Sequence, residues 1–158
     1  MLANLKDSAA TESAGAALAE VLPEADMVIY LRGELGAGKT TLVRGVLRAL
    51  GHRGRVPSPS YTLVEPYELP GRSLQHLDLY RIGDPGELSF LGVRDLSGTL
   101  FVEWPERGEG RLPAADLICR LSLEGGGRRL EAEAGSPRGE ELKHKWSQRL
   151  QTQGIVGL

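Results

Sequence analysis

The clearest hydrophobic pattern in the chain is a short apolar run followed by a helical repeat. Residues 27–31, MVIYL, are apolar and include β-branched side chains, which is typical of a buried parallel strand. Over residues 43–50 the apolar positions recur at spacings of three and four, which predicts the buried face of a helix that Gly51 ends. The sequence therefore predicts a strand, a tight loop and a helix in that order.

Similar patterns predict the other elements. Residues 8–22 are rich in Ala, Glu and Leu and predict a helix with Ser8 or Thr11 as its N-cap and Pro23 at its end. Strands are predicted over 62–65, 74–81, 99–105, 116–123 and 130–134, the last two forming a hairpin, and helices from Asp84 and over 139–150. Residues 151–158 are expected to form a frayed tail.

The composition is that of an ordinary globular protein. At 158 residues the chain suits a single domain over 1–158, and 41% hydrophobic and 25% charged residues fit one packed core. A net charge of −2 argues against a protein that holds nucleic acid alone through a large basic face. Residues 1–10 lack an apolar segment and no apolar stretch approaches about 20 residues, so we expect a cytoplasmic protein without signal peptide or membrane span.

The loop between the first predicted strand and helix has the spacing of a phosphate site. Residues 33–41, GELGAGKTT, fit G-x-x-x-x-G-K-[ST], in which glycines let the backbone N–H groups converge on one anion. The next helix begins at the phosphate, with its positive dipole end toward it. Lys39 can then reach the β- and γ-phosphates, and the Thr40 hydroxyl can ligate Mg²⁺. A glycine-rich turn without function is the alternative, and the flanking strand and helix favour the nucleotide site.

Two predicted strands carry acidic residues that suit such a site. Residues 74–81 alternate strictly, so His76, Asp78 and Tyr80 share one face of a strand. Polar groups of this kind cost free energy if they are buried and unused, which favours a site over a solvated strand face. Glu103 ends a short buried strand, where P-loop proteins place a second metal-directed carboxylate. The alternative for Glu103 is a salt bridge at the rim.

A hydroxyl-rich segment follows the P-loop helix. Residues 56–62, VPSPSYT, are held extended by two prolines. In many P-loop proteins such a segment is a nucleotide-sensing switch, and an ordinary loop fits this sequence equally well. Trp104 is either a contact of the nucleotide or a partner, or part of the core. The switch or partner candidates are Ser58, Ser60, Tyr61, Thr62 and Trp104.

Taken together, the motifs resemble the TsaE (YjeE) family, the P-loop ATPases of bacterial tRNA threonylcarbamoyladenosine (t6A) biosynthesis. The resemblance runs from Thr11 to about Arg129. It rests on GELGAGKTT at 33–41, SPSYTLVE at 58–65, HLDLYR at 76–81 and VEWP at 102–105. Ser60 stands where the family usually has Thr, which keeps the hydroxyl. The resemblance implies an α/β, P-loop NTPase-like fold, with a mainly parallel sheet flanked by helices and antiparallel strands added late.

The resemblance also implies ligands and partners. These are ATP or ADP with Mg²⁺, and the TsaD and TsaB proteins, whose complex attaches a threonylcarbamoyl group to the adenosine next to the anticodon. Contact with tRNA is then indirect, through the complex, and neither DNA nor a membrane is a partner. The ATPase of this family does not transfer the group itself, and its nucleotide cycle is thought to reset the TsaD–TsaB complex between turnovers.

Carried over residue by residue, the resemblance gives the motif positions roles. The phosphate-binding residues are Gly36, Ala37, Gly38, Lys39, Thr40 and Thr41. Thr40 and Glu103 ligate Mg²⁺, and Asp78 is an essential acid near the γ-phosphate. The catalytic set is therefore Lys39, Asp78 and Glu103, and the division of metal binding between the two acids stays open. Thr11 is placed near the nucleotide, and Arg128 near the base.

The reaction expected from these groups is Mg²⁺-assisted hydrolysis of ATP. Lys39, the loop amides and Mg²⁺ supply charge, and Asp78 or a group that it orients positions the water. Arg81 is the closest candidate for an arginine finger, and the lack of an evident finger predicts weak activity alone. The alternatives are a small-molecule kinase, with a lid flanked by Arg107 and Arg111, and a nucleotide switch that does not hydrolyse. A GTPase is disfavoured because no Lys is followed two residues later by Asp.

Overall fold

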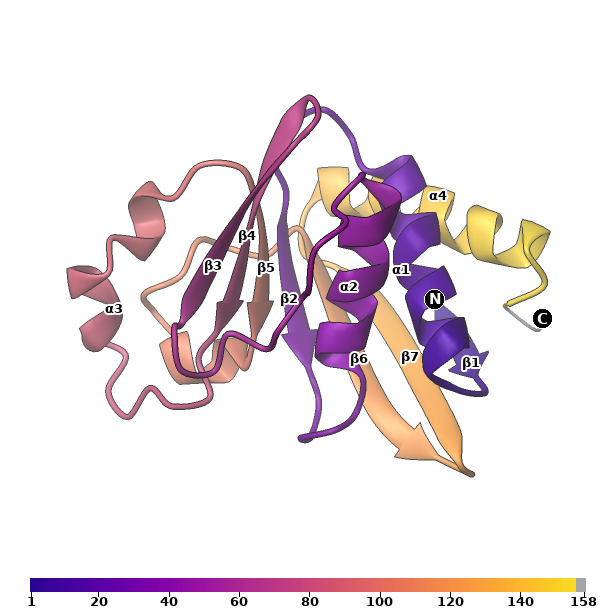
Figure 1. Cartoon of the computed structure of the whole chain (residues 1–158), viewed down its shortest axis with the longest axis horizontal. Coiled ribbons are helices and arrows are strands. Elements are labelled where there is room, and N and C mark those ends of the chain that lie inside the picture. Colours follow the sequence, from indigo (N-terminus) through magenta and orange to yellow (C-terminus); the bar gives the residue numbers. More distant parts are fainter. Residues whose placement is uncertain (156–158) are drawn as a thin grey trace.

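A seven-stranded sheet forms the centre of the computed structural model, which describes residues 1–155 and, for Phe90, the backbone alone. The strand order is β1-β7-β6-β2-β5-β4-β3 (Figure 1). The strands are Leu2–Leu5 (β1), Val28–Arg32 (β2), Val64–Leu69 (β3), Arg72–Asp78 (β4), Thr99–Glu103 (β5), Leu117–Glu124 (β6) and Gly127–Ala134 (β7). Strands β6, β2, β5 and β4 are parallel, and β1, β7 and β3 add antiparallel pairs at the edges. This confirms the predicted α/β class.

Helices and short turns cover both faces of the sheet. They are α1 (Ser8–Val21), α2 (Lys39–Ala49), α3 (Glu87–Phe90) and α4 (Pro137–Thr152), with 3₁₀ turns at Val93–Asp95 and Pro105–Gly108. One cluster of buried side chains joins α1, α2 and α4 to alternate strand residues such as Leu74 and Phe101. A second cluster uses the intervening residues, such as Leu77 and Val102, with Leu88 of α3. Because strand side chains alternate, the two clusters lie on opposite faces.

The parallel strands bring the predicted site motifs to one edge of the sheet. Strand β2 lies between β5 and β6, and β4 lies on the other side of β5. In Figure 1 the arrowheads of β2, β4 and β5 point to the same edge, where the loop between β2 and α2 also lies. Ligand sites of open α/β sheets form outside the carboxyl ends of the strands. The topology therefore favours a site at this edge.

Two helices differ from the sequence predictions. Helix α1 is capped by Asp7, whose Oδ1 accepts the Ala10 N–H at 2.8 Å, rather than by Ser8 or Thr11. Asp7 has the extended backbone that an N-cap needs. The helix predicted from Asp84 is only the four residues of α3, and the Asp84 side chain instead accepts the N–H of Gly86.

Strand β1 is an element that the sequence patterns did not predict. It is only four residues long and includes Ala3 and Asn4, which carry little strand propensity. Its backbone pairs with β7, and the side chains of Ala3 and Leu5 are buried in the core. The strand therefore depends on a partner about 130 positions away in the chain, which a local pattern cannot reveal.

The C-terminal helix closes one face of the fold. Ser136 caps α4 by accepting the N–H of Gly139 at 3.0 Å, and the fully buried Trp146 donates to the carbonyl of Ala14 at 2.9 Å. In the region predicted to be a frayed tail, α4 continues through Thr152, and residues 156–158 lie outside the described residues. Within residues 1–155, no helix is long and apolar enough to cross a membrane.

Helices α1 and α2 cross closely at two glycines. A Cβ on Gly15 would lie 2.2 Å from the carbonyl oxygen of Leu42, and one on Gly45 would lie 2.1 Å from that of Glu12. Real Cβ atoms do not approach backbone oxygens so closely. Since α2 begins at the predicted phosphate loop, this crossing holds the start of the helix in place.

We predict that Gly45→Ala lowers the free energy of unfolding by about 1–3 kcal/mol, because the added methyl forces the two helices apart. Urea titration followed by tryptophan fluorescence measures the change. Gly83→Ala is the matched control, since a Cβ there would meet only Glu87 Oε1 at 3.8 Å. We expect the control to stay within about 0.5 kcal/mol. Equal effects of the two variants would contradict the close crossing.

Candidate functional site

The loop between β2 and α2 has backbone geometry that suits an anion. Gly33, Gly36 and Gly38 have φ angles of 151°, 80° and 107°, in the region that favours glycine. A Cβ on Gly33 would lie 2.4 Å from the carbonyl oxygen of Leu121, so this position also lacks space for a side chain. Helix α2 starts directly after Gly38 with no side-chain cap. Its first N–H groups and its positive dipole end are therefore free for a phosphate.

The ammonium of Lys39, the first residue of α2, lies against the backbone of this loop. The Lys39 side chain is buried, its ammonium donates to the carbonyl of Gly33, and Nζ lies 3.9 Å from the centre of the Trp104 ring. Burial lowers the pKa of Lys39, and the nearby charges of Glu103 and Asp78 oppose that shift. The ammonium thus lies between the loop backbone and the ends of β4 and β5.

The two predicted acids lie side by side at the ends of adjacent parallel strands. The register of β4 and β5 pairs Asp78 with Glu103, and each residue is only 3% exposed. Asp78 Oδ1 accepts the backbone N–H of Tyr80 at 2.9 Å, and Oδ2 accepts the Ser58 hydroxyl at 3.0 Å. Burial raises the pKa of Asp78, the Tyr80 N–H opposes the shift, and the charge of Glu103 adds to it.

Glu103 connects the loop to the interior of the sheet. Its Oε2 accepts the hydroxyl of Thr40 at 2.8 Å and lies 2.6 Å from Nε2 of the fully buried His76. The alternative of a rim salt bridge is therefore wrong for Glu103, which is buried and faces the loop. The sequence pattern places His76 on the polar face of its strand but gives it no role, and its contact with Glu103 appears only in three dimensions.

A cavity of about 280 Å³ lies in front of these groups. It is lined by Leu35, Gly36, Gly38, Lys39, Thr40, Thr41, Ser58, Ser60, Asp78, Glu103, Trp104 and Arg128. A larger hollow of about 730 Å³ lies elsewhere, between β1, α1 and the residues after α4. We take the smaller cavity as the candidate site because loop amides, an ammonium and two carboxylates converge on it.

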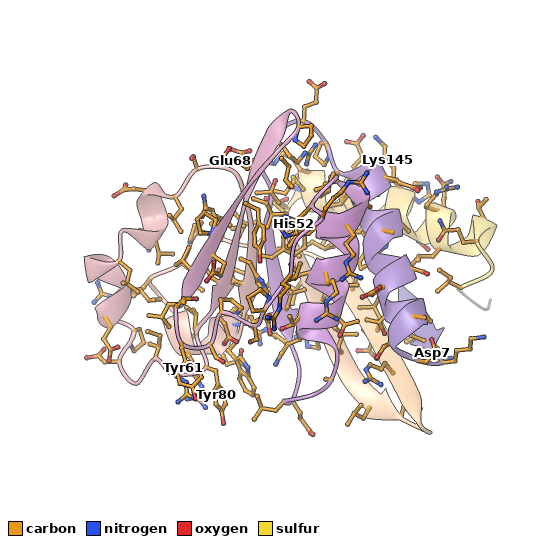
Figure 2. The ribbon with its side chains drawn as sticks, in the orientation of Figure 1. Asp7, His52, Tyr61, Glu68, Tyr80 and Lys145 are labelled. Atoms are coloured by element: carbon orange, nitrogen blue, oxygen red, sulfur yellow. The ribbon has the colours of Figure 1, made fainter. Side chains whose placement is uncertain are left out.

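The predicted switch segment contributes to the cavity with only some of its residues. Ser58 and Ser60 line it, whereas Thr62 is exposed and Tyr61 is 80% exposed. The Arg81 guanidinium lies 3.9 Å from the Tyr61 ring centre. Figure 2 shows Tyr61 and Tyr80 together at the edge of the sheet where β4 ends. Arg81, the sequence's candidate for an arginine finger, therefore contacts the switch segment in this structure.

Trp104 belongs to the rim of the cavity. It follows β5 with φ of 57°, which is uncommon for a residue with a side chain, and its ring is half-buried. Besides Lys39, the ring contacts Tyr80, with ring centres 5.0 Å apart, and Arg107, whose guanidinium lies 5.5 Å away. Arg111, the other arginine of the lid alternative, instead contacts Ser89 at 3.5 Å. The two arginines thus make different contacts in this structure.

The remaining predicted residues lie around the loop. Ala37 is fully buried beneath it, and its N–H donates to the carbonyl of Glu34 at 3.1 Å. Thr11 is also buried and donates to the carbonyl of Asp7 at 3.1 Å; it is not among the residues that line the cavity, but its Cγ2 would lie 3.5 Å from a Cβ on Gly38. Arg128 packs on the loop, where a Cβ on Gly38 would lie 2.9 Å from its Cδ. Within residues 1–155, Arg128 Nε is buried without a hydrogen-bond partner.

The donor set fits a magnesium ion that arrives with a nucleotide. Thr40 offers a hydroxyl, and Asp78 and Glu103 offer carboxylates, which are the oxygen ligands of hard cations. In the described part of the chain, no group of three or more His, Cys, Asp or Glu residues is arranged to hold a metal alone. Mg²⁺ commonly binds through one or two carboxylates together with substrate phosphates and water, so an incomplete protein set suits it.

The fold and the loop together define a protein of the P-loop NTPase-like class. The family model described as "Threonylcarbamoyl adenosine biosynthesis protein TsaE" matches residues 5–130. The chain therefore belongs to the TsaE family, which takes part in t6A biosynthesis.

Individual relatives agree with this assignment. The tRNA threonylcarbamoyladenosine biosynthesis protein TsaE of Haemophilus influenzae is 44% identical over 135 residues, covering 81% of this chain and 85% of that protein. The TsaE protein of a Synechocystis species is 43% identical, covering 65% and 69% of the two chains. The crystal structure of YdiB from Bacillus subtilis matches 94% of both chains with a TM-score of 0.79 and 26% identity.

Proposed function

We propose that this protein binds ATP with Mg²⁺ at the P-loop and hydrolyses it as an accessory step of t6A biosynthesis. The proposal is supported by the groups that line the cavity. The free amides of α2, the Lys39 ammonium, the Thr40 hydroxyl and the carboxylates of Asp78 and Glu103 converge on one cavity. Positioning and charge stabilisation are the main requirements of phosphoryl transfer, and these groups can supply both.

Each group has a part in this proposal. The loop amides and Lys39 bind the phosphate oxygens, and Lys39 would leave its contact with Gly33 to do so. Thr40 and Glu103 would hold Mg²⁺, which when bound neutralises charge that develops on the phosphates. Asp78 positions the attacking water, directly or through Ser58, because its carboxylate already accepts the Ser58 hydroxyl and Ser58 lines the cavity.

The isolated protein is expected to turn over slowly. Arg81 stacks on Tyr61, and Arg128, which lines the cavity, packs against Gly38 of the loop. We propose that neither arginine acts as a finger in the isolated protein, and a missing finger leaves such enzymes slower by a factor of about 10³ or more. We propose that assembly with TsaD and TsaB in the cytoplasm completes or commits the cycle, with tRNA contacted only through that complex. The net charge of −2 agrees with indirect contact.

We predict that Lys39→Ala abolishes ATP hydrolysis and weakens ADP binding at least about tenfold, because the site loses the ammonium that faces the phosphates. Calorimetric titration with ADP and a phosphate-release assay measure the two effects. Lys143→Ala is the control, since this lysine pairs with Glu140 on the surface of α4 and should behave as the wild type. Unchanged turnover of Lys39→Ala would refute the P-loop assignment.

A second prediction separates the two acids. We expect Asp78→Asn to lower kcat about 10²–10⁴-fold while ADP affinity in saturating Mg²⁺ changes little, because the acid acts on the water. Glu103→Gln should instead raise the Mg²⁺ concentration needed for half-maximal rate. Steady-state kinetics over a range of Mg²⁺ distinguishes the variants. Interchanged phenotypes would show that the roles are assigned to the wrong residues.

A third prediction tests the pathway role. Addition of TsaD and TsaB should raise the rate of phosphate release by the wild type at least about tenfold, because the partners supply what the isolated site lacks. The same addition should leave Lys39→Ala inactive, which controls for ATPase activity in the partner preparations. Fast turnover by the isolated protein, or no response to the partners, would contradict the accessory role.

A further inference from the structure

His76 occupies a position that packing alone does not explain. The side chain is fully buried in β4, two residues before Asp78 and on the same face of the sheet. Its Nε2 lies 2.6 Å from Glu103 Oε2, and among residues 1–155 its Nδ1 has no hydrogen-bond partner. An unpartnered buried nitrogen costs free energy that an apolar side chain of similar volume would avoid. The useful part of His76 is therefore the contact that Nε2 makes.

The contact of His76 is with Glu103, one of the two proposed metal ligands, and it comes from the interior of the sheet. In the register of β4 and β5, His76 pairs with Phe101, two residues before the pair of Asp78 and Glu103 on each strand. Nε2 donates to the same carboxylate oxygen that accepts the Thr40 hydroxyl at 2.8 Å. The Glu103 carboxylate is thus fixed from the sheet interior by His76 and faces Thr40 at the start of α2.

We propose that His76 is a positioning residue for the metal ligand Glu103. Its Nε2–H holds the Glu103 carboxylate in the orientation that faces Thr40, so that both ligands are in place before Mg²⁺ and nucleotide arrive. This inference rests on the proposed function. Ligands that are already oriented lose less freedom on binding, and the groups that orient metal ligands commonly change metal affinity 10- to 100-fold.

Strand β4 carries two residues that affect the cavity, Asp78 and His76. Asp78 at the end of β4 faces the cavity itself, and His76 acts on the cavity through the neighbouring strand β5. A displacement of β4 relative to β5 would therefore alter both acids together. A role of His76 in packing alone would predict a change in stability and none in metal affinity.

The test measures Mg²⁺ affinity rather than activity. Calorimetry gives the affinity for ADP at a series of Mg²⁺ concentrations and without Mg²⁺, and urea titration gives stability. We expect His76→Leu to weaken Mg²⁺ binding in the ADP complex about 10- to 100-fold and to change metal-free ADP affinity less than about twofold. Gln75→Leu is the matched control, because Gln75 is a buried polar residue on the opposite face of β4 that contacts Ser97. It should leave Mg²⁺ affinity unchanged.

A pair of amide variants keeps the test informative if His76→Leu does not fold. His76→Gln can place an N–H near the position of Nε2, and His76→Asn is too short to do so. We expect Gln to recover Mg²⁺ affinity to within about threefold of the wild type and Asn not to recover it. In a Glu103→Gln background, His76→Leu should cause no further loss of Mg²⁺ affinity, because the two residues act in series.

Three results would overturn the inference. The first is Mg²⁺ affinity in His76→Leu or His76→Asn that stays within twofold of the wild type, which would leave only a structural role. The second is an equal loss of ADP affinity with and without metal. The third is a wild-type protein whose ADP binding does not depend on Mg²⁺, and this result alone would also overturn the proposed function.

Discussion

The parallel register of β2, β5 and β4 is the constraint on which the site depends. It pairs Leu31, just before the phosphate loop, with Glu103, and it pairs Glu103 with Asp78. The loop and both carboxylates therefore reach the same edge of the sheet although they lie far apart in the chain. Close glycines at the crossing of α1 and α2 then hold the helix that carries Lys39 and Thr40 at this edge.

The register also places the carboxylates of Asp78 and Glu103 next to each other, which is electrostatically unfavourable. Two buried carboxylates side by side repel each other when both are charged. The structure compensates with hydrogen-bond donors, since Ser58 and the Tyr80 N–H serve Asp78, and Thr40 and His76 serve Glu103. Burial raises the pKa of Asp78 and lowers that of Lys39, so both shifts reflect a desolvated site. Such a site is suited to exchange its internal contacts for a phosphate and a divalent cation.

The sequence predicts the parts of this site that depend on local patterns. The loop, the strand before it, the helix after it and the acids at two strand ends all follow from glycine spacing, periodicity and alternation. The missing parts depend on distant partners. Strand β1 exists because it pairs with β7, and the role of His76 depends on Glu103, which is far away in the chain. Arg128 was placed near the base by the family resemblance, and its packing on Gly38 likewise joins distant parts of the chain. The Asp7 cap was missed because neighbouring residues have equally suitable side chains.

We propose that the loop, Thr40 and Glu103 form one site for a nucleotide with its metal. A crystal structure with Mg²⁺ and a non-hydrolysable ATP analogue tests this proposal most directly. We expect phosphates against the first N–H groups of α2, with Lys39 turned from Gly33 toward them. We also expect a metal ion about 2.0–2.1 Å from the Thr40 hydroxyl oxygen and close to the Glu103 carboxylate. Nucleotide bound elsewhere, such as in the hollow beside α1, or a metal without contact to Thr40 would show that these groups do not form one site.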